Sequence, residues 1–304
     1  MVAYLFAGQG SQYVGMGEDL YESFPQSKAV FDKADKVLGF SLRELCFQGP
    51  SQELTKTQNC QPAILTVSIA ALEAYKGVTS HKSQVTSYAA GLSLGEYSAL
   101  VAAEALSFED AVYLVRKRGE FMEEEAARRP GKMLSVIGLD RESVKQLCLQ
   151  TNTEIANINC PGQIVISGGV AEIEKAQAQA KGIGAKMAVA LEVSGAFHSS
   201  FMKEAALKLA KELEKITINM PKIPVICNVS ARQVNSTAEI KENLIKQVSS
   251  SVLWEDSMKF ILSQGVANFI EFGPGSVLKG LMRRIESGAQ VISIEKKEDI
   301  LALQ

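Results

Sequence analysis

The chain has 304 residues, of which 46% are hydrophobic and 22% are charged, and its formal net charge is −2. This composition is typical of a globular protein with a sizeable core. The near-neutral charge offers no general attraction to nucleic acid or to an anionic membrane. No apolar stretch approaches the roughly 20 residues that span a bilayer, and the opening MVAYLFAGQG has no basic segment. We therefore expect no signal peptide, no membrane or nucleic-acid partner, and a cytoplasmic location.

The five cysteines are scattered along the chain and form no CxxC pair. Zinc sites and disulfide frameworks in sequences usually show paired or regularly spaced cysteines. We therefore expect reduced thiols and no bound metal.

Apolar runs of strand length alternate with longer helical patterns, which predicts an α/β fold with parallel strands. The alternation is clearest in the two outer parts of the chain. Strands are expected there at 3–8, 84–91, 223–229 and 267–273, and helices at 96–106, 107–126, 200–213 and 276–285.

The middle of the chain, from about 131 to 190, has a different order of elements. Its strand and helix patterns follow the sequence βαββαβ, which is the ferredoxin-like arrangement. We therefore predict a small ferredoxin-like subdomain at 128–192. It would be inserted into a large α/β-hydrolase-like domain with a parallel sheet, made of residues 1–127 and 193–304. The cleft between two such domains is a preferred place for a ligand.

The stretch GLSLGEYSAL, residues 91–100, follows an expected strand and precedes an expected helix. In that context G-x-S-x-G is typical of a nucleophile elbow, where Gly91 and Gly95 let the chain turn tightly around Ser93. The start of the next helix would also direct backbone N–H groups toward an oxyanion. A Gly/Ser turn without any chemistry is the alternative for so short a pattern.

A serine hydroxyl needs a neighbouring base to become a good nucleophile. The chain has only two histidines, His81 in a polar loop and His198 in VSGAFHSS, just before a helical pattern. The start of a helix disfavours imidazolium and so keeps a nearby histidine neutral. By elimination His198 is the better candidate for the base, and a turn histidine without a chemical role is the alternative.

The expected helix at 107–126 opens with a capping box from Ser107 to Asp110. Helical spacing then places Arg118 on one apolar face with Ala111, Val115 and Met122. A buried guanidinium without an anion is costly. Its partner is either an internal Asp or Glu, or a substrate carboxylate, which arginine can hold through two parallel hydrogen bonds.

The turn AGQGSQ, residues 7–12, ends the first expected strand. A dinucleotide-binding fingerprint would need glycine at position 13, where Tyr13 stands, so that function is excluded. Gln9, between Gly8 and Gly10, could lie near a reaction centre, although a plain glycine turn explains the same residues.

Six blocks in this order resemble the malonyl-CoA:acyl carrier protein transacylases, and also the acyltransferase domains of polyketide synthases. They are FAGQGSQ, GLSLGEYSALVAA, RKRGEFM, NINCPGQIVISG, VSGAFH and IEFGPGSVLKGL, and they cover nearly the whole chain. The resemblance implies that malonyl moves from malonyl-CoA to the phosphopantetheine thiol of an acyl carrier protein in fatty acid synthesis. No permanently bound cofactor is implied.

The resemblance also implies roles for individual residues. Ser93 would be the nucleophile, His198 the base and Arg118 the group that binds the malonyl carboxylate. Gln9 and the backbone N–H of Leu94 would form the oxyanion hole. Gln247 would orient His198 through its backbone carbonyl. Asn157, Asn159 and Phe197 would line the cleft that binds the substrate.

Three features depart from the family pattern, one of them the lack of a common proline in SSSV, residues 249–252, close to Gln247. Leu92 stands where many relatives have histidine, and Ala196 where close relatives often have proline. Three rival functions also stay open. The rivals are a trans-acting malonyl acyltransferase of a polyketide synthase, an acyl-thioester hydrolase of the same fold, and a carrier-binding module without catalysis.

Overall fold

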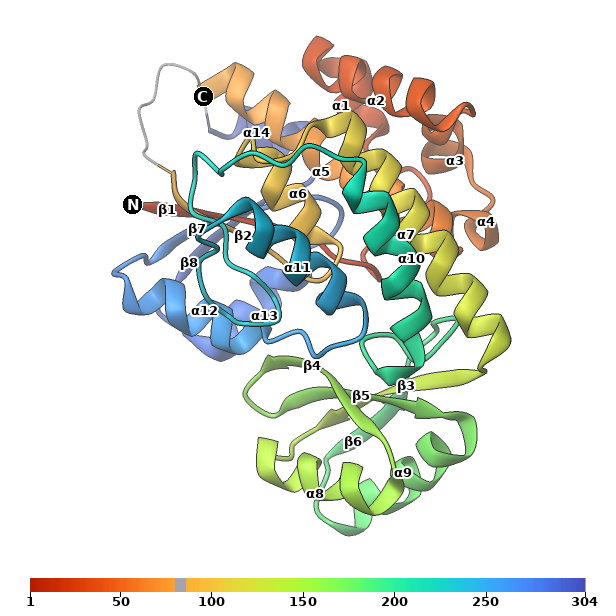
Figure 1. Ribbon diagram of the computed structural model, residues 1–304. Coiled ribbons are helices and arrows are strands. Elements are labelled where there is room, and N and C mark those ends of the chain that lie inside the picture. The colour runs from red at the N-terminus through yellow and green to blue at the C-terminus, as the bar shows by residue number, and fades with distance from the viewer. Residues whose placement is uncertain (80–85, 304) are drawn as a thin grey trace.

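The computed structural model describes residues 1–79 and 86–303 and contains two separate four-stranded sheets (Figure 1). The larger sheet is entirely parallel, with the strand order β2-β1-β7-β8. Its strands are β1 (Val2–Phe6), β2 (Thr86–Gly91), β7 (Asn268–Phe272) and β8 (Gln290–Ile294).

Strand β1 is central and buried on both faces. Tyr4 and Phe6 face the larger hydrophobic cluster, whereas Ala3 and Leu5 face a second cluster around Trp254. This alternation follows from the two-residue period of a strand, and burial on both sides explains why the strand is apolar throughout. Helices cover both faces: α5 (Thr57–Thr79), α6 (Gly95–Ala102), α7 (Phe108–Arg128), α10 (Lys203–Glu214) and α11 (Thr237–Val248) contribute to the first cluster, and α12 (Trp254–Ser263) and α13 (Val277–Ile285) to the second.

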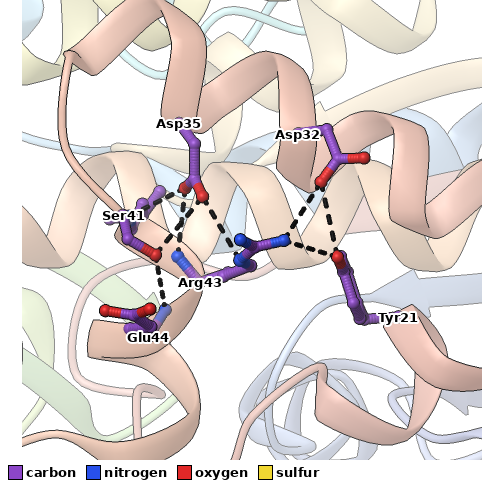
Figure 2. Close-up of polar contacts among 7 residues, drawn as sticks. Tyr21, Asp32, Asp35, Ser41, Arg43 and Glu44 are labelled. Carbon is purple, nitrogen blue, oxygen red and sulfur yellow. Dashed lines mark hydrogen bonds and ion pairs between the residues drawn. The ribbon is translucent and has the colours of Figure 1, made fainter.

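Short helices of the N-terminal part pack beside α5 at the top of Figure 1. Asp35 of α2 caps α3, because its Oδ1 accepts the backbone N–H of Leu42 at 2.7 Å and that of Arg43 at 3.2 Å. Figure 2 shows the guanidinium of Arg43 between Asp35, Asp32 and Tyr21. These contacts fix the short elements that lead into α5: α1 (Glu18–Ser23), α2 (Pro25–Leu38), α3 (Leu42–Gln48) and α4 (Ser51–Thr55).

The second sheet is antiparallel, has the order β4-β5-β3-β6 and forms the lower part of the molecule in Figure 1. Two helices pack on it around a hydrophobic core of their own. The chain order is βαββαβ, which confirms the predicted ferredoxin-like unit inside an α/β fold. Its elements are β3 (Gly131–Ile137), α8 (Arg141–Thr151), β4 (Glu154–Cys160), β5 (Gln163–Gly169), α9 (Val170–Gly182) and β6 (Met187–Ala190).

The division at 128 and 192 stays a proposal, and α7 runs to Arg128, across the first of these boundaries. Contacts between elements around the parallel sheet and elements of the antiparallel sheet's unit fix the position of the two sheets relative to each other. The backbone of Val252, after α11, exchanges hydrogen bonds of 2.9 and 2.8 Å with Ile158 and Ala156 of β4. Arg141 of α8 forms an ion pair with Asp256 of α12 at 2.9 Å.

Two expectations for the large α/β domain differ from the structure. The segment 223–229 is no regular strand, because only Val225 and Ile226 form isolated bridges, to Ala89 and Gln233. Pro224 lacks the N–H that a ladder needs. Helix α6 ends at Ala102 rather than at 106. His81 and residues 84–85 lie outside the described residues.

The remaining short elements are η1 (Ser200–Met202), which precedes α10, and α14 (Lys297–Leu301) near the end of the chain. In the part of the chain that the structure describes, every helix is too short or too polar to cross a membrane.

Candidate active site

The turn between β2 and α6 places Ser93 at its tip, in the left-handed backbone region with φ of 51°. Glycine is required on either side of it. A Cβ atom on Gly91 would lie 2.0 Å from the backbone of Gly95, and one on Gly95 would lie 2.2 Å from the carbonyl oxygen of Phe6. The predicted tight turn therefore exists, and its geometry is that of a nucleophile elbow.

Asn228 holds this turn from the side. Its Oδ1 accepts the N–H of Ser93 at 2.6 Å, and its Nδ2 donates to the carbonyl of Gly91 at 2.8 Å. The next N–H, that of Leu94, has no hydrogen-bond partner within residues 1–79 and 86–303. An unpaired N–H at the start of a helix is available to an anion. The side chain of Leu94 itself is fully buried.

His198 lies beside the serine. Its Nε2 is 2.8 Å from Ser93 Oγ, and its Nδ1 is 2.8 Å from the backbone carbonyl oxygen of Gln247. Because a carbonyl oxygen only accepts, Nδ1 carries the proton, and Nε2 is free to accept the proton of Ser93. Burial, and secondarily the charge of Arg118, lowers the pKa of His198 to about 4. Burial is therefore the main cause that keeps the base neutral.

Arg118 lies on the buried face of α7 together with Ala111, Val115 and Met122, as its spacing predicted. Only 2% of Arg118 is exposed, and burial lowers its pKa. Its guanidinium donates to Gln61 Oε1 at 2.8 Å, and through one nitrogen to Ser93 Oγ and Gln247 Oε1, each at 3.0 Å; these are neutral acceptors.

No carboxylate forms an ion pair with Arg118 within the described residues, and its Nε has no partner there. Of the two partners that the sequence left open, the internal Asp or Glu is thus not found. A buried cation with unused donors beside the serine is suited to a substrate carboxylate.

Three buried polar residues of this network were not predicted from the sequence: Gln61, Glu96 and Asn228. Glu96 accepts from Gln247 Nε2 at 2.7 Å and from the N–H of Asn228 at 3.0 Å. Burial raises the pKa of Glu96 to about 7, and these two donors oppose the rise. Its place three residues after Ser93, in the first turn of α6, was the signal that could have identified it.

A cavity of about 560 Å³ opens in front of Ser93, His198 and Arg118, between the two sheets. One wall comes from the small subdomain, where Asn157 and Asn159 of β4 both reach the cavity. The large α/β domain contributes side chains that include Gln9, Leu92, Phe197 and Val277. Among the described residues, Gln9 Nε2 makes only a long contact, 3.4 Å to Thr57 Oγ1. Of the predicted residues, only the side chains of Leu94 and Gln247 lie behind the cavity wall.

Across the described ranges, no three His, Cys, Asp or Glu side chains gather in a way that could hold a metal ion. All five cysteines are free and buried.

Residues 3–297 match the family model of the acyl transferase domain, which defines the class of the protein as an acyltransferase. The malonyl CoA-acyl carrier protein transacylase of Bacillus subtilis is 49% identical over 311 residues, covering 100% of this chain and 96% of that relative. The same enzyme of Coxiella burnetii has a TM-score of 0.95 at 37% identity, covering 99% of this chain and 96% of that one. The chain therefore belongs to the malonyl CoA-acyl carrier protein transacylase family, which confirms the resemblance in its sequence.

A third similar protein is a malonyl-transacylase solved in complex with a type II polyketide synthase acyl-carrier protein. It has a TM-score of 0.94 at 39% identity, covering 99% of this chain and 98% of that one.

Proposed function

We propose that this chain moves malonyl from malonyl-CoA to the phosphopantetheine thiol of an acyl carrier protein, through a malonyl ester on Ser93, and so feeds fatty acid synthesis. One observation carries this proposal. Ser93 Oγ lies 2.8 Å from the nitrogen of a neutral histidine and 3.0 Å from a buried arginine that has no carboxylate partner among the described residues. A nucleophile, its base and a receptor for an acidic acyl chain are thus within one side-chain length.

In the first half-reaction Ser93 Oγ attacks the thioester carbon while His198 Nε2 takes its proton. The charge that develops on the carbonyl oxygen would be met by the free N–H of Leu94 and by Gln9. One such donor is typically worth about 3 kcal/mol in the transition state. Collapse of the tetrahedral intermediate breaks the C–S bond, and His198 returns its proton to the departing coenzyme A thiolate.

In the second half-reaction the carrier thiol enters the emptied cavity. His198 takes the thiol proton, the sulfur attacks the malonyl ester, and Ser93 leaves with the proton that His198 gives back. The substrates alternate on one serine, so we expect ping-pong kinetics. In this mechanism malonyl-CoA is a substrate, and no permanently bound cofactor takes part. We also propose that the protein acts in the cytoplasm.

Selection of malonyl would come from Arg118, with Phe197 beside it. A malonyl carboxylate can accept two parallel hydrogen bonds from the guanidinium, whose hydrogen-bond acceptors among the described residues are all neutral. An acetyl group offers no such partner and leaves the buried cation unpaired. Phe197 is 4% exposed and fills part of the cavity wall, so its ring would restrict branched acyl chains.

A transfer assay tests this function against its rivals. We expect malonyl to appear on the phosphopantetheine form of an acyl carrier protein faster than free malonate is released in its absence. Release of malonate that outpaces transfer would identify a hydrolase, and absence of both would identify a binding module. A carrier protein of a polyketide synthase in parallel reactions distinguishes the two transferase functions, because the better carrier has the higher kcat/KM.

The rate of acylation should change little when the pH is lowered from neutral to mildly acidic values. His198 acts in its neutral form, and its pKa is lowered to about 4, so kcat/KM for malonyl-CoA should stay level from pH 8 to about pH 5 and fall by half near pH 4. The profile is measured by following coenzyme A release in buffers of constant ionic strength. An acid limb near pH 6.5, the ordinary value for histidine, would contradict the buried, neutral base.

A further inference from the structure

A buried glutamate, Glu96, lies close to Ser93 but takes no part in the bond-making steps described above. It is 2% exposed; the hydrogen bonds that it accepts from Gln247 Nε2 and from the N–H of Asn228 both end on one atom, Oε2, and the side chain of Cys227 is a further hydrogen-bond partner. Burying a carboxyl group is costly unless its oxygens are well used. The two donors to Oε2, Gln247 and Asn228, both contact residues of the reactive site: Gln247 contacts Arg118 and His198, and Asn228 contacts Ser93.

The side chain of Gln247 is held at both ends. Its Nε2 donates to Glu96 Oε2 at 2.7 Å and to the carbonyl of Ser93 at 3.0 Å, while its Oε1 accepts from Arg118 at 3.0 Å. An amide rotated by 180° would present its NH2 group to the guanidinium, which has only donors. The acceptor on Glu96, together with the carbonyl of Ser93, therefore keeps the oxygen of Gln247 facing Arg118.

The backbone of Gln247 has a separate task, because its carbonyl accepts from His198 Nδ1 at 2.8 Å. A displaced Gln247 would disturb both the base and the arginine. Asn228 completes the connection: Oε2 of Glu96 accepts its backbone N–H, and its side chain bridges Ser93 and Gly91. One oxygen, Oε2 of Glu96, thus connects Gln247, which contacts His198 and Arg118, with Asn228, which holds the turn at Ser93.

We propose that Glu96 is a positioning residue for acyl transfer, and that the location of its Oε2 as an acceptor, rather than its negative charge, is what it contributes. Through Gln247 it sets the orientation of Arg118 and His198, and through Asn228 it supports the turn at Ser93. This inference rests on the proposed function. Because the hydrogen bonds from Gln247 and Asn228 end on a single oxygen, a neutral side chain of the same length can supply the same acceptor.

A matched pair of variants separates reach from charge. Glu96→Gln keeps an oxygen at the same distance and loses the charge, whereas Glu96→Asp keeps the charge and withdraws the oxygen by about 1.5 Å, beyond hydrogen-bond range of one or both donors. We expect E96Q to retain kcat/KM for malonyl-CoA within about threefold, and E96D to lose about ten- to a hundredfold, as for a lost hydrogen bond in a charged network.

The ratio of malonyl to acetyl transfer is the readout that a merely structural role would not move. In E96D this ratio should fall about tenfold or more, because a reoriented Gln247 displaces Arg118, which only the malonyl group uses. Melting temperatures show which variants are folded. Glu125→Gln is the control, since Glu125 is also buried but its ion-pair partners, Arg128 and Lys208, lie outside the cavity lining.

The ranking of the variants decides the question. E96Q that loses as much as E96D, or E96D with an unchanged malonyl-to-acetyl ratio, would overturn the proposal. Glu96→Met, which has similar length but no acceptor, must behave like E96D, so either variant suffices if the other does not fold. Failure of the wild-type protein to transfer malonyl would instead overturn the proposed function, and the two failures are therefore distinguishable.

Discussion

Replacement of His198 by alanine is expected to lower kcat/KM for malonyl-CoA by about 10²- to 10⁴-fold. Ser93 Oγ would then keep its contact with Arg118 at 3.0 Å but lose the acceptor at 2.8 Å. A hydroxyl that only receives a hydrogen bond from a cation is a poor nucleophile. Stopped-flow measurement of coenzyme A release, before any carrier protein is added, isolates this half-reaction.

Two controls accompany the His198 variant. Added imidazole should restore part of the lost rate, because the missing side chain leaves room beside Ser93 in the cavity. Substitution of His81, the chain's other histidine, should leave the rate within about twofold of wild type, because the proposed mechanism gives it no role. Comparable losses in the two histidine variants would show that His198 has no special role.

Replacement of Arg118 by alanine should change which acyl group is transferred. We expect kcat/KM for malonyl-CoA to fall about 10³-fold, because removing one partner of a buried, hydrogen-bonded charge pair costs about 2–5 kcal/mol. Acetyl transfer should change by less than about tenfold, since no carboxylate is left unpaired. Parallel assays with malonyl-CoA and acetyl-CoA measure the ratio directly.

Arg116→Ala is the matched control on the same helix. Arg116 carries the same charge, but it is partly exposed and forms an ion pair with Glu120 at 2.7 Å. Its loss should leave the malonyl-to-acetyl ratio unchanged. Equal losses of malonyl and acetyl transfer in the Arg118 variant would mean that the guanidinium only supports the fold.

The parts of the site that depend on local geometry could be predicted from the sequence. Glycine on both sides of Ser93 requires a tight turn, and the 3.6-residue period of α7 places Arg118 among apolar residues. The small subdomain was recognised because its βαββαβ order appears in sequence as alternating short patterns. In each case the signal is local, because each turn, helix or strand is indicated by a few neighbouring residues.

The supporting polar residues could not be predicted in this way. Gln61, Asn228 and Gln247 come from three distant segments, and only the packing of α5 and α11 beside the turn brings them together. Their side chains are ordinary in composition and follow no periodic pattern. The resemblance supplied the backbone role of Gln247, but the task of its side chain appears only in the three-dimensional contacts.

For the segment 223–229 the sequence predicts more regular structure than is present, because its apolar run is typical of a full strand. Its backbone does lie beside β2, where the N–H of Ala89 donates to the carbonyl of Pro224 at 2.9 Å. The pairing soon ends, since the chain turns back on itself through Cys227 and Ala231. That turn is what brings Asn228 against Ser93, so the irregular backbone here serves the site.

Mass spectrometry of the protein after brief exposure to malonyl-CoA shows directly whether Ser93 carries the acyl group between the two half-reactions. We predict a malonyl adduct on the peptide that contains Ser93, its disappearance when the carrier protein is added, and no adduct in the Ser93→Ala variant. A malonyl group found on another residue, or a carrier protein loaded equally well by Ser93→Ala, would rule out a malonyl ester on Ser93 as the intermediate.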